Sequence, residues 1–508
     1  MNKQQLASTI WESANQMRSK IEANEYKDFI LGFIFYKYLS ERELELFRKE
    51  KLSDEEIRKV DESDVEYAKH VRETLGYFIS YNNLFSTWLE KGSDFDIKDV
   101  RDALSDFDRN IDEVYNKVFA KIFNTLQTGM SKLGETSGAQ TKSVKKLLRL
   151  IKKIPMDGKQ DYDVLGFIYE YLISNFAANA GKKAGEFYTP HEVSVLMSEI
   201  VAEHLKDKKQ IKIYDPACGS GGMFVQTGDF VNQKGLQANN TMTFYGQEKV
   251  EYNAQLCLMN MAVHGLTGVI KSGDDANTFY HDAHNLAGSC NYVMANPPFN
   301  VDKVKAESAQ AAGRLPFGIP GVNKAGEFGN ANYLWISYFY AYLNETGRAG
   351  FVMASSATDS AGKDKNIREK LVQTGNVDVM ISVGNNFFYT KSLPCTLWFF
   401  DRGKKEKVKG KTLFIDARNY YTVVDRTLNE WTDWQIKNLT AIVWLYRGET
   451  EKYAALLNEY RDALQKYANE AESTDPIKAA VTEDFSTTVD NLKKYQSSPY
   501  LCVNCLQV

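Results

Sequence analysis

Short β-rich runs alternate with helical stretches through much of the chain, and this alternation constrains the fold more than any other feature. Four successive runs are IKIYD ending at Asp215, TFYGQE ending at Glu248, GVIKSGD ending at Asp274 and NYVMA ending at Ala295. Others follow at GFVMASS, VDVMISV, TLWFF and TLFID. Strands that alternate with helices form βαβ units, so we predict an α/β fold with a mostly parallel, doubly wound, Rossmann-like sheet. Such sheets bind ligands at the carboxyl ends of their strands.

The segments on either side of this region have helical patterns. From residue 1 to about 155 the sequence has amphipathic runs and few turn-rich segments, and Pro155 begins a PMDGKQD stretch typical of a domain boundary. We therefore predict a helical N-terminal domain (1–155), an α/β domain (156–427) and a helical C-terminal region (428–508). The C-terminal region has one face of large side chains at helical spacing: Tyr453, Leu456, Leu457, Tyr460, Leu464 and Tyr467. This face suits packing against the chain's own domain or contact with another subunit about equally.

Composition indicates where the chain works. Its first residues lack an apolar signal segment, and the longest early apolar run, Phe29 to Tyr36, is too short to span a membrane. Six cysteines in 508 residues do not make a disulfide framework, so we expect a cytoplasmic protein with no membrane segment. A net charge of −4 is unusual for a protein that holds nucleic acid without help. Two basic runs, Lys142–Lys153 and Lys404–Lys411, are candidates for phosphate contact, although a solvated helix face and a charged surface turn are the favoured interpretation.

A glycine-rich turn follows the first predicted strand. The sequence YDPACGSGGMF places Asp215 at the strand end and Gly219, Ser220, Gly221 and Gly222 in the turn before a helix. Glycines let a cofactor approach the backbone closely, although a purely structural turn or a dinucleotide site would use the same residues. No Walker A loop is present in the sequence, so we expect no ATP-driven chemistry.

Glu248 separates the cofactor alternatives. As an acid at the end of the next strand, it can accept hydrogen bonds from both hydroxyls of a ribose. It lies 33 residues after Asp215 (248 minus 215), whereas a dinucleotide fingerprint places its ribose acid about 20 residues on. The turn also lacks the spaced G-x-G-x-x-G pattern. We therefore predict S-adenosylmethionine rather than NAD, with Asp274 accepting from the adenine amino group of the cofactor or, alternatively, serving as a surface turn acid.

The sequence NYVMANPPF places Asn296, Pro297, Pro298 and Phe299 after the fourth strand. An exocyclic adenine amine is a poor nucleophile because its lone pair is delocalised into the ring. The Asn296 side-chain oxygen and the Pro297 carbonyl can accept the two amine hydrogens, while the prolines fix the backbone so that both acceptors converge. Phe299 would stack on an adenine rotated out of double-stranded DNA. This motif predicts methyl transfer to the N6 amine of adenine.

Together these residues resemble the amino-methyltransferases, and most closely the modification subunits of type I restriction-modification systems. The most specific piece is KKAGEFYTPHEV from Lys182 to Val193, and LGFIFYKYLSER, YEYLISNFA and ANYLWIS also look like family sequence. The resemblance implies that the methionine side of the cofactor pocket is lined by Glu186, Phe187, Tyr188, Thr189, Pro190 and His191. Asp215 and Phe299 depart from the broader pattern of an aromatic residue and a tyrosine, but type I subunits commonly have both variants.

The resemblance also implies partners. A specificity subunit would read the DNA sequence, with two copies of this chain for each specificity subunit, and a restriction subunit would join for cleavage. Two other interpretations stay open: a self-sufficient methyltransferase acting on RNA or on a protein glutamine, and a non-catalytic scaffold that clamps DNA. The EFYTP segment and the large helical domain argue against the first, and the intact Asn296, Pro297 and Glu248 argue against the second.

Three further features of the sequence are less specific. The long, glycine-containing segment between Phe299 and Asn330 is expected to be a mobile active-site loop that orders around DNA. His281 and His284 lack a third ligand arranged with them, so no metal site is predicted. Cys502 and Cys505 form a lone C-x-x-C, best explained as an incidental tail.

Overall fold

A computed structural model describes residues 3–15, 23–156, 168, 171–172, 189–201, 210–388, 394–426 and 428–470. The chain divides into two compact units. One contains residues 1–188, 219–221 and 251–267, and the other contains the rest of the chain. Among the described residues, no helix has both the length and the apolar character needed to cross a bilayer.

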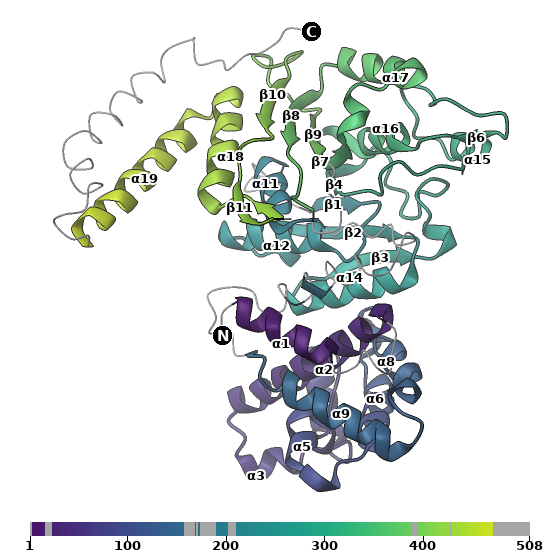
Figure 1. Cartoon of the computed structure of the whole chain (residues 1–508), viewed down its shortest axis with the longest axis vertical. Coiled ribbons are helices and arrows are strands. Elements are labelled where there is room, and N and C mark those ends of the chain that lie inside the picture. The colour runs from purple at the N-terminus through teal and green to yellow at the C-terminus, as the bar shows by residue number, and fades with distance from the viewer. Residues whose placement is uncertain are drawn as a thin grey trace. The chain divides into compact units, whose positions relative to one another are not determined.

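The first unit is helical, as predicted for the N-terminal part of the chain (Figure 1). Its helices are α1 (Lys3–Asn15), α2 (Ala23–Lys49), α3 (Asp54–Ile57), α4 (Val65–Leu75), α5 (Phe85–Glu90), α6 (Ile97–Arg109), α7 (Asn116–Phe119), α8 (Asn124–Gly129), α9 (Ser137–Ile151) and α14 (Glu251–Val263). Aromatic side chains fill the core, and Tyr36 stacks on Trp88 with ring centroids 4.7 Å apart. Apolar residues of α14 belong to the same core, although this helix lies about 100 residues later in the sequence than the other helices of the unit.

One carboxyl group is buried in that core. Glu43 of α2 has no exposed surface, and both of its oxygens accept from the Ile79 amide at 3.0 Å. Burial raises the pKa of Glu43 well above its usual value, while the Ile79 hydrogen bond lowers it. A buried neutral carboxyl is the arrangement that this balance favours.

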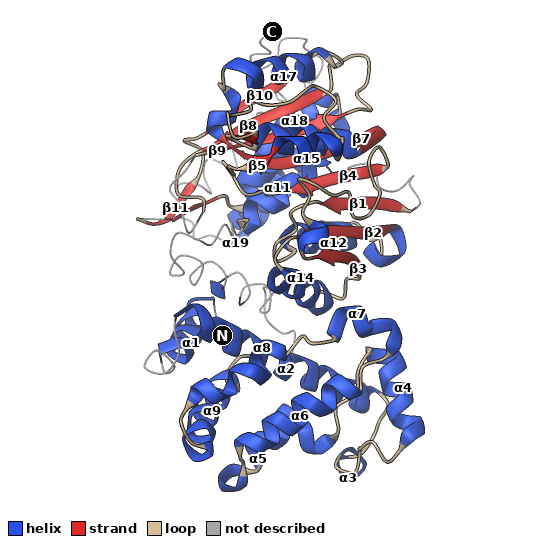
Figure 2. Cartoon of the chain, turned by 90° about the vertical axis from the view of Figure 1, so that its right-hand side faces the viewer, coloured by secondary structure: helices blue, strands red, loops and turns tan. Residues whose placement is uncertain are grey.

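The second unit is built on an eight-stranded sheet with the order β10-β8-β9-β7-β4-β1-β2-β3 (Figure 2). The strands are β1 (Ile211–Asp215), β2 (Met242–Glu248), β3 (Gly268–Ser272), β4 (Cys290–Ala295), β7 (Leu343–Ala354), β8 (Val377–Val383), β9 (Cys395–Asp401) and β10 (Leu413–Ala417). Only β9 runs antiparallel to its neighbours among these strands, so the predicted mostly parallel α/β sheet is confirmed.

Helices and two small ribbons complete this unit. The helices are α11 (His191–Val201), α12 (Gly222–Gln233), α13 (Ala238–Thr241), α15 (Ala306–Ala311), α16 (Asn332–Tyr342), α17 (Gly362–Gln373), α18 (Asp433–Arg447) and α19 (Thr450–Glu470). The ribbons pair β5 (Val304–Lys305) with β6 (Glu327–Phe328), and β11 (Thr422–Asp425) with β12 (Leu428–Glu430). The chain segment between Phe299 and Asn330 thus contains α15 and the β5/β6 ribbon, with Phe317 and Phe328 buried, so it is not structureless.

An ion cluster buried in the second unit fixes α18. The Arg447 Nη2 atom lies 2.7 Å from Asp378 Oδ2, and Lys404 Nζ lies 3.5 Å from Asp378 Oδ1. Burial alone would raise the pKa of Asp378, but the charges of Arg447 and Lys404 hold it below its usual value. Removing one partner would leave an uncompensated buried charge, which is strongly destabilising. The helix is therefore an integral part of the α/β unit.

The C-terminal helix α19 packs on α18. Leu456 and Leu457 are buried, and the Tyr460 hydroxyl donates to Asn438 Oδ1 at 2.6 Å while its ring lies 4.7 Å from that of Trp434. Leu464 is only half-buried, and the Tyr467 side chain lies outside the described residues. The first half of the large-residue face is thus used within the chain, which supports the packing interpretation for that half.

Candidate active site

The carboxyl ends of β1 and β2 place two acids near one another. Strand register pairs Asp215 with Gly246, two residues before Glu248. Asp215 is 2% exposed, and its Oδ1 accepts from the Ala217 amide at 2.9 Å. Burial raises the pKa of Asp215 to about 8; the Ala217 hydrogen bond opposes this rise and the charge of Glu248 adds to it. Asp215 is therefore a carboxyl that a cationic ligand can convert to its ionised form.

Glu248 ends β2, as the sequence predicted. Its side chain is half-buried, and Oε1 accepts from the Val250 amide at 2.8 Å. That local bond holds the carboxylate at the strand end, the position at which sheets of this kind bind ligands.

The position predicted for Asp274 is wrong. Strand β3 ends at Ser272, so Asp274 does not end the strand but begins a short 3₁₀ turn after Gly273, and its side chain is exposed. Gly273 has φ +87°, a conformation that turns the chain before the acid. The carboxylate is therefore accessible just after the carboxyl end of β3, and its contact with the cofactor stays a prediction.

The glycine turn combines one crowded position with two open ones. Gly221 has φ +79°, and a Cβ there would lie 2.7 Å from Cys257 Sγ of α14. Gly219 also has a positive φ, +51°, but a Cβ at Gly219 or Gly222 would meet no atom within 4 Å. The Ser220 carbonyl accepts from Asn260 Nδ2 of α14 at 3.0 Å. The turn is thus fixed on one side by α14 and has an open backbone elsewhere.

The catalytic motif predicted from the sequence follows β4 directly. Asn296 is 8% exposed, and its Nδ2 donates to Thr189 Oγ1 at 3.0 Å. These two residues are 107 positions apart, so the fold brings Thr189 to the NPPF motif. With the amide nitrogen directed to Thr189, the Oδ1 atom is the acceptor on the other arm of the amide. The order of these two atoms is assigned from the hydrogen bond.

Three asparagines beyond the motif hold its backbone, and the sequence reasoning missed them. Asn300 has φ +54°, and its amide donates to Asn332 Oδ1 at 2.9 Å. In return, Asn332 Nδ2 and Asn330 Nδ2 each donate to Asn300 Oδ1 at 2.9 Å. Asn332 belongs to the ANYLWIS stretch, which was noted only as family-like sequence. The available sequence signal was the asparagine directly after NPPF, because Asn is common in turns and tolerates a positive φ better than most residues.

A buried glutamine network supports the same edge of the sheet and was also missed. Gln247 Oε1 accepts from the Tyr214 hydroxyl at 2.6 Å and from the Ala283 amide at 2.9 Å. Its Nε2 donates to Thr278 Oγ1 at 3.2 Å, and Thr278 in turn donates to the Pro216 carbonyl at 2.5 Å. The ends of β1 and β2 and the segment before β4 are therefore tied together by satisfied polar groups.

The remaining predicted residues have different locations. Pro190 is buried, and its carbonyl accepts from Ser194 in the first turn of α11, where His191 is exposed. Phe299 is half-buried and packs against the core of the α/β unit. Of the residues singled out from the sequence, five lie outside the described part of the chain: Glu186, Phe187, Tyr188, Cys502 and Cys505.

No group of three possible metal ligands occurs among the described His, Cys, Asp and Glu side chains. His284 Nε2 instead lies 2.8 Å from the Gly246 carbonyl. This contact gives the histidine a place in the packing around β2.

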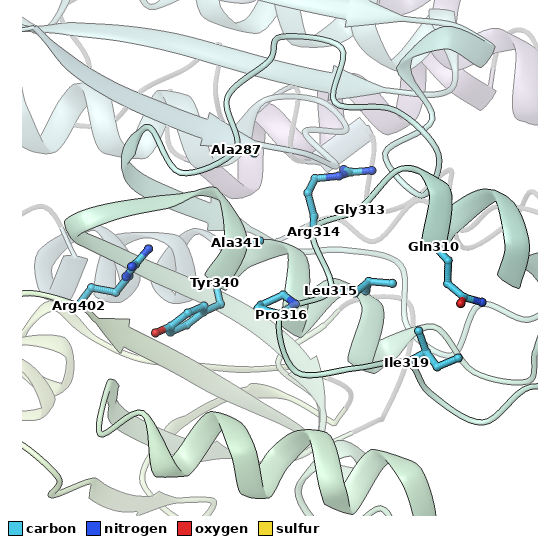
Figure 3. Close-up of a pocket in the computed structure, with 10 residues that line it drawn as sticks. All are labelled: Ala287, Gln310, Gly313, Arg314, Leu315, Pro316, Ile319, Tyr340, Ala341 and Arg402. Carbon is cyan, nitrogen blue, oxygen red and sulfur yellow. The ribbon is translucent and has the colours of Figure 1, made fainter.

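A hollow of about 730 Å³ in the α/β unit has no predicted site residue in its lining (Figure 3). Its lining comprises Ala287, Gln310, Gly313, Arg314, Leu315, Pro316, Ile319, Tyr340, Ala341 and Arg402. Arg314 Nη1 donates to the Thr278 carbonyl at 3.0 Å, and Arg402 Nη1 donates to the Leu343 carbonyl at 2.6 Å. Because both guanidinium groups have backbone partners, we assign no anion to this hollow.

Comparisons with known proteins match nearly the whole chain. The family model described as N-6 DNA methylase matches residues 160–485, and the model of the HsdM N-terminal domain matches residues 6–154. The type I restriction enzyme MjaIX methylase subunit of Methanocaldococcus jannaschii is 31% identical over 85% of this chain and 75% of its own length. The MpnII methylase subunit of Mycoplasma pneumoniae is 26% identical over 90% of this chain and 86% of its length.

A solved structure gives the same result. The type I restriction-modification methyltransferase subunit from Streptococcus thermophilus superposes with a TM-score of 0.74 and 26% identity, over 87% of this chain and 93% of that one.

Proposed function

The chain belongs to the N-6 DNA methylase family, as a methylase subunit of the type I restriction-modification kind, and we propose that it methylates the N6 amine of adenine in a specific DNA site, using S-adenosylmethionine. One observation supports this most strongly: Asn296 of the NPPF motif donates to Thr189 of the EFYTP segment. The resemblance assigns the first segment to the target amine and the second to the methyl donor. Their contact supports a site in which the methyl donor and the target amine meet.

Asn296 and Pro297 act on the amine. The Asn296 Oδ1 and the Pro297 carbonyl accept the two amine hydrogens, which draws the nitrogen toward tetrahedral geometry and localises its lone pair. The hydrogen bond to Thr189 fixes the amide plane of Asn296, and the prolines restrict the backbone at the second acceptor. Asn300 and Asn332 hold the chain that follows. Little reorganisation is then required when the adenine arrives.

Phe299 holds the target base in this proposal. Methyl transfer requires an adenine outside the duplex stack, and an aromatic face stabilises such a base. The side chain is half-buried, so part of it is anchored in the protein while part is accessible to a base. Phenylalanine offers stacking but no hydroxyl, so no hydrogen bond from this position takes part.

The donor set of the predicted cofactor site fits S-adenosylmethionine. Gly219 and Gly222 present backbone with open space, Glu248 offers carboxylate oxygens to ribose hydroxyls, and Asp215 is a buried acid suited to a cation. When bound, S-adenosylmethionine supplies an electrophilic methyl group on a sulfonium. The protein orients this donor through the EFYTP segment, of which Thr189 and Pro190 are described. Asp274, exposed just after β3, accepts from the adenine amino group of the cofactor in this proposal.

The chain acts within an assembly in this proposal. A specificity subunit reads the DNA site, two copies of this chain accompany it, and a restriction subunit joins for cleavage. The net charge of −4 supports this division of labour, since sequence readout by the chain alone would favour a basic surface. The division into residues 1–155, 156–427 and 428–508, and a cytoplasmic location, stay predictions.

Expression in a host that lacks adenine methylases tests the function. The chain is produced with and without its specificity subunit, and long-read sequencing maps every modified base. We expect N6-methyladenine at a single DNA motif, and only when both subunits are present. Methylated cytosine, or efficient site-specific adenine methylation by the chain alone, would contradict the proposal.

A further inference from the structure

Helix α9 presents a row of cations that the proposed mechanism does not use. Three of them, Lys142, Lys146 and Arg149, lie in the helix, and the fourth, Lys153, follows two residues after its end at Ile151. They are spaced at intervals of four, three and four residues, and all are exposed. We call these four residues the α9 stripe. The opposite side of the helix is buried in the core of the helical unit through Val144, Leu147, Leu148 and Ile151. Lys142, Lys146 and Arg149 therefore lie on the solvent face of α9, and the buried side of the helix fixes its orientation in the helical unit. Figure 1 shows α9 among the helices of this unit.

The α9 stripe has no acidic partners. No carboxylate forms an ion pair with any of the four side chains in the part of the chain that the structure describes. Neighbours at helical spacing are themselves basic, and like charges at that spacing destabilise a helix. Lys145 differs, because it donates to the Ser93 carbonyl at 3.0 Å and lies 5.8 Å from the Phe95 ring centroid. Local stability does not account for the stripe.

The helix macrodipole accounts for only part of the α9 stripe. Basic residues near a helix C-terminus interact favourably with the macrodipole, and this applies to Arg149 in the last turn and to Lys153 just after the helix. Lys142 and Lys146 lie earlier in the helix, beyond the range of that effect. Their charge points to a use outside the fold, because a conflict with local stability is typical of functional positions.

Charge is unevenly distributed along the helical domain. Residues 50–113 contain 18 acidic and nine basic side chains, whereas residues 114–156 contain nine basic side chains and one acid, Glu135. A chain of net charge −4 thus concentrates cations in the segment that includes α9. Such asymmetry is typical of binding to a polyanion.

We propose that the α9 stripe binds the phosphate backbone of the double-stranded DNA that contains the target site. This proposal rests on the proposed function, which makes that DNA the substrate. At a rise of about 1.5 Å per residue, the seven-residue interval from Lys142 to Arg149 extends about 10.5 Å along α9, and Lys153 follows beyond the helix end. A DNA strand places a phosphate about every 3.4 Å along its axis, so about three phosphate intervals span the helical part of the stripe.

The exposed face of α9 suits DNA better than a membrane. No large apolar side chain of the helix is exposed: Val144, Leu147, Leu148, Leu150 and Ile151 are all buried. A helix that lies in a lipid surface needs apolar residues for insertion, and α9 offers none on this side. Contacts to phosphate position a protein on DNA without reading its sequence, which complements a separate subunit that does.

The test replaces the stripe in the full chain, assembled with its specificity subunit. One variant carries Lys142→Gln, Lys146→Gln, Arg149→Gln and Lys153→Gln. A matched control removes the same number of exposed charges from the turn between β9 and β10, through Lys405→Gln, Lys407→Gln, Lys409→Gln and Lys411→Gln. Fluorescence anisotropy measures the Kd for a DNA duplex with the target site across a series of salt concentrations.

We expect the stripe variant to bind DNA about ten- to a hundredfold more weakly at physiological salt. The slope of log K against log salt should fall by about 2 to 4, since each phosphate contact contributes about 0.9. The control should keep the wild-type slope. Equal slopes in stripe variant and wild-type would overturn the proposal, as would an equal loss in the control.

Two further measurements separate this proposal from misfolding and from the proposed function. The thermal midpoint of the stripe variant should equal or exceed that of wild-type, because like-charge repulsion is relieved. If the variant unfolds, replacing the three lysines with arginine should keep DNA affinity, and loss of affinity there would contradict the proposal. Methyl transfer at saturating DNA tests the proposed function separately. If wild-type transfers no methyl group but its DNA binding still depends on the α9 stripe, the proposed function is refuted and the proposal for the stripe stands.

Discussion

Replacing Asp215 with Asn tests the electrostatics of the cofactor site. The carboxyl is buried, and burial raises its pKa from 3.8 to about 8, so about nine in ten Asp215 side chains are protonated at pH 7. Asparagine keeps an oxygen that can accept from the Ala217 amide but cannot ionise. S-adenosylmethionine is cationic, and its binding should draw the proton from Asp215. The variant therefore removes one proton equilibrium and little else.

The sign and size of the effect follow from linkage. In the free protein the raised pKa lowers the free energy of unfolding, because Asp215 ionises more readily in the unfolded chain. This loss of stability grows as the pH rises from about 3.8 to about 8. If only the ionised form of Asp215 binds the cofactor, affinity rises up to about tenfold per pH unit below pH 8, which is about 1.4 kcal/mol per unit. Between pH 6 and pH 8 the Kd should therefore fall by up to about a hundredfold and then level off.

Isothermal titration calorimetry at pH 7 in buffers of different ionisation enthalpy measures the protons released. Wild-type should release close to one proton more per bound cofactor than Asp215→Asn, and only wild-type should show the rise in affinity with pH. Asp275→Asn, which changes an exposed acid, is the matched control and should behave as wild-type. Equal proton release by wild-type and Asp215→Asn would refute the reasoning.

Three other changes give separate tests. Glu248→Ala should weaken cofactor binding by about 1 to 3 kcal/mol by leaving ribose hydroxyls unpaired, and an unchanged Kd in calorimetry would make Glu248 a structural acid. Thr189→Val removes the acceptor for Asn296 Nδ2 and should slow methyl transfer roughly ten- to a hundredfold, whereas Thr189→Ser should restore it; equal rates in both would contradict a positioning role. Glu43→Gln keeps an acceptor for Ile79 and removes a buried ionisable group, so its stability relative to wild-type in urea unfolding should increase from pH 5 to pH 8; a constant difference would show that Glu43 ionises freely.

The sheet could be predicted because its signals are local. The run IKIYD is β1, and TFYGQE and NYVMA fall within β2 and β4. Asp274 was misplaced by two residues, because the glycine before it turns the chain out of β3. Strand ends of this kind depend on which backbone groups find partners across the sheet, and one sequence does not reveal that.

Side-chain partners far apart in sequence could not be predicted. Spacing alone gives no reason for Thr189 to meet Asn296, or for Gln247 to collect Tyr214 and Thr278 in one network. The resemblance supplied the roles of both motifs, and the type I methylase family was confirmed by the comparisons. Only the fold supplies the contact. The secondary structure in the segment after Phe299 was missed for a similar reason, because its few buried residues, such as Phe317 and Phe328, do not form a periodic pattern.

The central claim is that Asn296 activates an adenine amine for methylation, and single-turnover methyl transfer tests it most directly. The complex assembled with the specificity subunit is mixed with labelled S-adenosylmethionine and a duplex containing the target site, and the product nucleoside is identified by mass spectrometry. Wild-type should form N6-methyladenine, and Asn296→Ala should be slower by about a hundredfold or more with cofactor Kd almost unchanged. Near-normal transfer by Asn296→Ala, or a wild-type product other than N6-methyladenine, would contradict the account.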